Sequence, residues 1–82
     1  MKKVYLDEIK VTAKLYNRRL EEGTLDNFAS ALYCGRFLAI KGIIEGDYEL
    51  DPEEANTWAA YLDKVVTRVV IGEVLIIESK SI

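Results

Sequence analysis

The 82-residue chain contains no histidine, and this absence removes the commonest routes to catalysis. Without histidine, the Ser-His and Cys-His pairs that activate nucleophiles cannot form, and most transition-metal sites lose a principal ligand. The sequence also has no phosphate-binding loop, dinucleotide-binding fingerprint or paired-cysteine motif. We therefore expect a protein that is not an enzyme and that carries no metal and no cofactor.

Cysteine is almost as scarce, because Cys34 is the only one. A single cysteine cannot form an intramolecular disulfide, which favours a reducing compartment, and we interpret it as a small, partly buried apolar residue. We expect neither a signal peptide nor a membrane span. Residues 65–77 are the most apolar stretch, but they are fewer than the roughly 20 residues that cross a bilayer. We predict a cytoplasmic protein that does not contact membranes.

Positive charge is in the minority, and the net charge of -3 gives no general attraction to a phosphate backbone. A DNA-binding regulator would need a basic face on the first helix. The residues available for it are Lys2, Lys3, Lys10, Lys14, Arg18 and Arg19. Glu8, Glu21 and Glu22 dilute that face, so nucleic acid is the weakest of the partners considered.

The few glycines and the single proline divide the chain into three blocks. Gly23 and Gly46 are suited to end helices, and Thr24 is suited to cap the next one. Asp51 followed by Pro52 is a typical helix start. Because half of the residues are apolar and 30% are charged, we expect one globular domain, residues 1–82, built only from α-helices. The predicted helices cover residues 4–22, 25–45 and about 52–79.

The second block is apolar on nearly every side, so it must be covered on most of its surface. Ala31, Gly35 and Ala39 follow one another at four-residue spacing and form a flat ridge. A glycine inside a helix costs about 1 kcal/mol relative to alanine, which close packing of another helix would offset. That helix can belong to the same chain or to a second copy.

The third block becomes apolar on more than one face after Val70. A helix that continues to residue 79 would project beyond its neighbours and form a contact surface. The predicted oligomer interface comprises Ile71, Val74, Leu75, Ile76, Ile77, Ala31, Gly35 and Ala39. The fold prediction is thus an oligomeric three-helix bundle with a long C-terminal helix.

A second interpretation of the same segment is a β-hairpin. Residues 65–71 and 74–79 are rich in β-branched side chains, and Gly72 with Glu73 between them suits a two-residue turn. The alternative fold therefore has two or three helices followed by a C-terminal hairpin.

Arg36 is the charge that fits its surroundings least well. On a helical wheel it falls among apolar residues, where a guanidinium needs either an internal acid, such as Asp63 or Glu8, or an external anion. Together with Lys41 and Tyr33 it forms the candidate site for a ligand or a partner.

These observations predict a small acidic helical protein that binds other proteins as an adaptor or inhibitor and acts as a homo-oligomer. The alternative is a protein that sequesters an anionic small molecule, such as a nucleotide, in a pocket between subunits.

Overall fold

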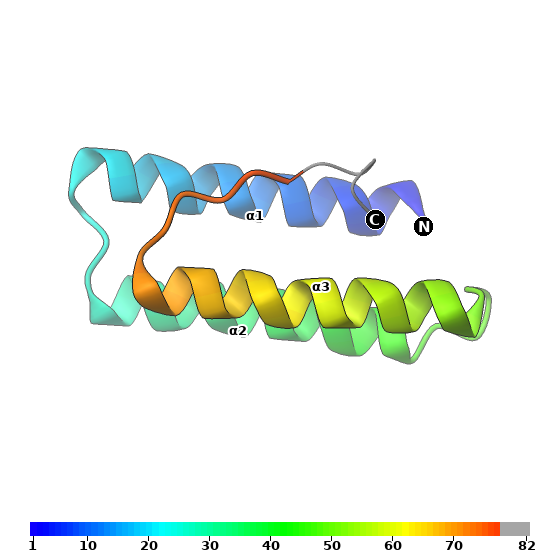
Figure 1. Cartoon of the computed structure of the whole chain (residues 1–82). Helices are drawn as coiled ribbons and strands as arrows, with labels where there is room; N and C mark the ends of the chain where they lie inside the picture. Colours follow the sequence, from blue (N-terminus) through cyan, green and yellow to red (C-terminus); the bar gives the residue numbers. More distant parts are fainter. Residues whose placement is uncertain (78–82) are drawn as a thin grey trace.

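The computed structural model describes residues 1–77, which form three α-helices and no strand. The helices are α1 (Lys3–Glu22), α2 (Asn27–Glu45) and α3 (Pro52–Ile71). In Figure 1, α2 runs antiparallel to both α1 and α3, and it packs against both of them. The all-α, three-helix prediction is therefore confirmed.

Helix ends follow local signals, with one correction at the start of α2. Gly23 ends α1 with φ 71°, a conformation that glycine adopts at little cost, and the N–H of Thr24 donates to the carbonyl oxygen of Arg19 at 2.9 Å. Thr24 was expected to cap α2, but this prediction is wrong. Asp26 is the cap, because its carboxylate accepts the N–H of Ala29 at 2.7 Å.

The prediction of a long third helix is also wrong, because α3 ends at Ile71. Gly72 has φ 78°, and the N–H of Glu73 donates to the carbonyl oxygen of Arg68 at 3.0 Å, so Gly72 ends α3 in the same way that Gly23 ends α1. The hairpin alternative fails as well, since residues 65–71 are helical. Both interpretations included Ser79, which lies outside the described residues.

Residues 73–77 form an extended tail that returns along α1, as the orange-to-red segment of Figure 1 shows. The Asn17 side chain holds both backbone groups of Leu75: its Nδ2 donates to the Leu75 carbonyl at 2.7 Å, and its Oδ1 accepts the Leu75 N–H at 2.9 Å. The Tyr16 hydroxyl donates to the carbonyl oxygen of Glu73 at 2.9 Å. These bonds replace the partners that a strand or helix would give the tail.

The tail also completes the core. Leu75 is only 4% exposed and Ile77 packs against the core, whereas Val74 and Ile76 point outward. Fully burying a side chain of this size contributes about 1.5–3 kcal/mol. The tail is therefore a fourth packing element of the bundle, made from residues that were expected to extend α3.

Candidate functional site

The outward side of α2 is an apolar surface that the packing of residues 1–77 leaves uncovered. The inward side of this helix faces the core through Ala29, Tyr33, Phe37, Ile40 and Ile44. Phe28 is 80% exposed, Ile43 is 56% exposed, and Leu32 and Leu38 are each 46% exposed. Every other exposed position from 28 to 43 holds alanine or glycine, except Arg36. We call the apolar set the α2 face; its members are Phe28, Ala31, Leu32, Gly35, Leu38, Ala39, Gly42 and Ile43.

Packing among residues 1–77 does not explain the glycines of the α2 face. A Cβ added at Gly35 or at Gly42 would meet no atom of these residues within 4 Å, and neither glycine has a positive φ. Each glycine costs about 1 kcal/mol relative to alanine in a helix interior. The close packing that the sequence predicted around Gly35 is thus not supplied by α1 or α3.

The predicted interface residues divide into two groups. Ala31, Gly35 and Ala39 are exposed on α2, and Ile71, Val74 and Ile76 are exposed at the end of α3 and along the tail. Leu75 is buried inside the chain, so it is not available to a partner, and Ile77 is partly buried against the core.

The sequence prediction missed Phe28, Leu32, Leu38 and Ile43. The signal was present, because the second block was recognised as apolar all round. What the sequence did not reveal was which stripe of α2 the other two helices would leave uncovered.

The candidate ligand residues do not come together. Tyr33 is buried, where its ring contacts Tyr16 edge-to-face at 5.8 Å between centroids. Lys41 donates to Asp63 of α3 at 2.9 Å, and this bond raises the pKa of Lys41. Arg36 is exposed, and none of the ion pairs within residues 1–77 involves it. Asp63, one expected partner of Arg36, pairs with Lys41 instead.

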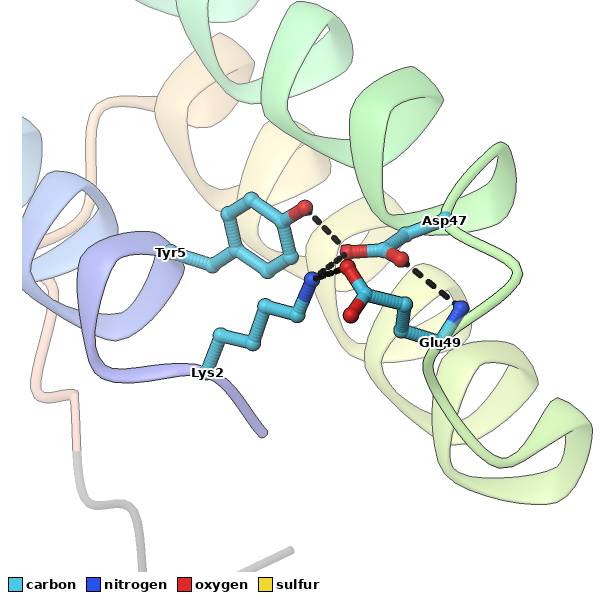
Figure 2. A network of polar contacts seen from close by, with 4 residues as sticks. All are labelled: Lys2, Tyr5, Asp47 and Glu49. Atoms are coloured by element: carbon cyan, nitrogen blue, oxygen red, sulfur yellow. Dashed lines mark hydrogen bonds and ion pairs between the residues drawn. The ribbon is translucent and has the colours of Figure 1, made fainter.

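The strongest electrostatic coupling lies at the end of the bundle where α1 begins. Figure 2 shows Lys2 and Tyr5 of the chain's N-terminal end pointing at Asp47 and Glu49, which belong to the α2–α3 loop. The Nζ atom of Lys2 lies 2.8 Å from Asp47 and 2.7 Å from Glu49. The hydroxyl of Tyr5 donates to Asp47, whose other oxygen accepts the N–H of Glu49 at 2.9 Å. We call these four residues the terminal network.

The terminal network shifts the pKa values of its members. Bonds from Lys2, from the Tyr5 hydroxyl and from the Glu49 N–H lower the pKa of Asp47 to about 2, and the two carboxylates raise the pKa of Lys2. The bond to Asp47 also raises the pKa of Tyr5. Shifted groups often mark active sites, but ion pairs that join structural elements shift pKa values in the same way. This network fastens the start of α1 to the α2–α3 loop.

The surroundings of Cys34 favour its protonated thiol. It is half-buried, its Sγ lies 4.0 Å from the carbonyl oxygen of Val66, and burial raises the pKa of its thiol. A raised pKa keeps the thiol protonated at neutral pH, and the thiolate is the nucleophilic form. This agrees with its interpretation as a small apolar residue.

Within residues 1–77, no helix is both long and apolar enough to cross a membrane, and no three acidic or cysteine side chains gather to hold a metal ion. Comparisons with protein-family models, with curated proteins and with solved structures found no match.

Proposed function

We propose that this chain is a non-enzymatic helical interaction protein of the cytoplasm, an adaptor or inhibitor, and that the α2 face is its contact surface. The observation that carries the proposal is the pair Gly35 and Gly42. Each lowers the helix propensity of α2, and neither is required by packing or by backbone conformation inside the chain. A partner that approaches the helix backbone closely gives both glycines a purpose.

The chemistry of the α2 face favours a protein helix as the partner. The face runs along a 19-residue helix, which is about 28 Å long at 1.5 Å per residue. It offers apolar side chains beside glycine and alanine, and Arg36 is the one charged residue among the exposed positions from 28 to 43. Amphipathic helices bind such surfaces through apolar residues spaced three and four apart. The dispersed positions of Arg36, Lys41 and Tyr33 give no comparable support to a small anionic ligand.

A matched pair of substitutions tests the proposal. Leu32→Lys places a charge on the α2 face, and Val70→Lys places the same charge at an exposed apolar site of α3. Tagged wild-type and variant proteins are used to capture binding partners, which are quantified by mass spectrometry. We expect the partners of the wild-type protein to be lost with Leu32→Lys and kept with Val70→Lys.

The opposite pattern would move the contact surface to the end of α3. If both variants keep every wild-type partner, the α2 face is not the contact surface. Circular dichroism of each variant shows whether the helices remain folded.

A further inference from the structure

We propose that the α2 face binds the α2 face of a second copy of the chain, antiparallel, about a two-fold axis beside residue 37. This inference rests on the proposed function, because it assumes that the α2 face is a contact surface. The order of large and small residues along α2 identifies a second copy as the partner. When two α2 helices lie antiparallel, the large residues of one face the small residues of the other.

The seam that another helix would follow contains Phe28, Leu32, Gly35, Ala39, Gly42 and Gly46. Their spacing alternates between four and three residues, as in the seam of a coiled coil. All six residues are exposed, including Gly46, the residue that caps the C-terminal end of α2. The large side chains lie in the first half of the seam and the glycines mainly in the second half.

An antiparallel pair centred on residue 37 sets each large residue opposite a small one. Phe28 of one copy meets Gly46 of the other, and Leu32 meets Gly42. Gly35 meets Ala39 close to the axis, where the two backbones approach most closely. A parallel pair would instead set Phe28 against Phe28 and Gly42 against Gly42, which crowds one end and leaves a gap at the other. Size complementarity therefore favours the antiparallel arrangement.

The two-fold arrangement also covers the α2 face of both copies in one contact. An isologous contact covers the same face on both copies, so self-association competes with the binding of any other protein to the α2 face. Leu38 lies one residue from the axis, where it comes close to Leu38 of the second copy and adds apolar area beside the seam. Arg36 lies at an equal distance on the other side of residue 37, so the same axis brings the two Arg36 side chains near each other at the rim of the contact, where water and salt screen the like charges.

Exchange of a large and a small residue tests the register. Gly42→Leu sets leucine against leucine and should weaken self-association by about tenfold or more. Adding Leu32→Ala to Gly42→Leu restores one large and one small residue at each contact and should recover most of the lost affinity. Sedimentation measures the affinity, and a folded monomer of 9.3 kDa is the reference species. Failure of the second substitution to restore affinity would overturn the register.

A distance measurement tests the orientation. A spin label at Asn27→Cys, in a chain whose native cysteine is replaced by Cys34→Ala, reports the separation of the two copies by electron paramagnetic resonance. Ten residues separate Asn27 from the axis, so an antiparallel dimer places the labels about 30 Å apart along the helix. A parallel dimer places them about 10 Å apart, the usual distance between packed helices, and would overturn the proposal.

The two proposals can fail separately. A wild-type protein that stays monomeric at high micromolar concentration overturns the self-association, whatever else it binds. If Leu32→Lys then still abolishes capture of another protein, the α2 face remains the contact surface and its occupant is that protein. If Leu32→Lys changes neither self-association nor capture, both proposals are wrong.

Discussion

The tail and the α2 face are both rich in apolar side chains, yet the packing of residues 1–77 covers part of the tail and leaves the α2 face bare. The tail places Leu75 in the core and has its backbone held by Asn17, while Val74 and Ile76 on either side of Leu75 face water. The α2 face exposes every one of its residues. The comparison shows that apolar content alone does not identify a contact surface.

The difference arises from backbone geometry. An extended segment turns alternate side chains to opposite sides, so half of a short apolar tail can be buried against one helix. A helix that is apolar all round needs partners on all sides, and a bundle of three helices supplies them on one stripe only. Extra apolar residues on a core helix are therefore the ones that remain for a partner.

The largest expected effect is a difference in the free energy of unfolding between alanine variants of two neighbouring tail residues. Leu75→Ala removes a buried side chain and should lower the free energy of unfolding by about 2 kcal/mol or more. Ile76→Ala alters a side chain that is 68% exposed and should change it by about 0.5 kcal/mol at most. Urea unfolding of both variants provides the measurement. Equal losses would show that the tail does not lie on α1 with alternate residues inward.

Removal of the Asn17 amide should have the next largest effect. Asn17→Ala leaves the N–H and C=O of Leu75 without their side-chain partner, which costs about 1–3 kcal/mol for buried groups. The matched control is Asn56→Ala, at an exposed position of α3. Amide hydrogen exchange at Leu75 should accelerate in the first variant only. Unchanged protection of that amide would mean that other contacts hold the tail.

These tail contacts also show where prediction from the sequence stopped. The glycine and proline signals predicted two of the three helix ends and the start of α3, because each acts on its own turn of backbone. Asn17 lies on the polar side of the first block, and nothing local indicates that it bonds a residue 58 positions away. The predicted third helix runs through Gly72 and only the alternative makes this glycine a turn, whereas Gly72 ends α3 as Gly23 ends α1.

The candidate site was predicted in part for the same reason. Periodicity identified Ala31, Gly35 and Ala39 as an unusual ridge, but the exposure of Phe28 and Ile43 depends on where α1 and α3 pack. The placement of Arg36 depends on the same packing. Two of its neighbours on the wheel, Leu32 and Ile43, are exposed, so a charge at this position reaches water without an internal partner.

On the α2 face, one added methyl group should raise the stability of the fold and lower the affinity of self-association. Gly35→Ala adds a Cβ into open space and should stabilise the dissociated chain by about 1 kcal/mol through helix propensity. The same Cβ would lie against Ala39 of a second copy and should weaken self-association. Urea unfolding at low protein concentration and sedimentation at high concentration measure the two effects. Ala60→Gly, at an exposed position of α3, should only destabilise. Weaker folding of Gly35→Ala would show that the chain itself uses this glycine.

The smallest expected effect is at Asp47 in the terminal network. It is compared with the uncharged Asn17 side chain, which holds the tail near the other end of α1. The pKa of Asp47 falls from an ordinary 3.8 to about 2 in the folded chain, so its bonds stabilise the fold fully above pH 3.8. That stabilisation is lost as the pH falls toward 2, because the carboxyl then binds a proton in both states. The urea midpoints of wild type and Asp47→Asn should differ by a constant amount above pH 3.8 and converge below it.

The control is Asn17→Ala. Its urea midpoint should differ from that of wild type by a constant amount over the same pH range, because an amide does not titrate. If the urea midpoints of wild type and Asn17→Ala converge at low pH, a carboxylate also holds the tail. The tail would then not differ from the terminal network in being held by uncharged groups.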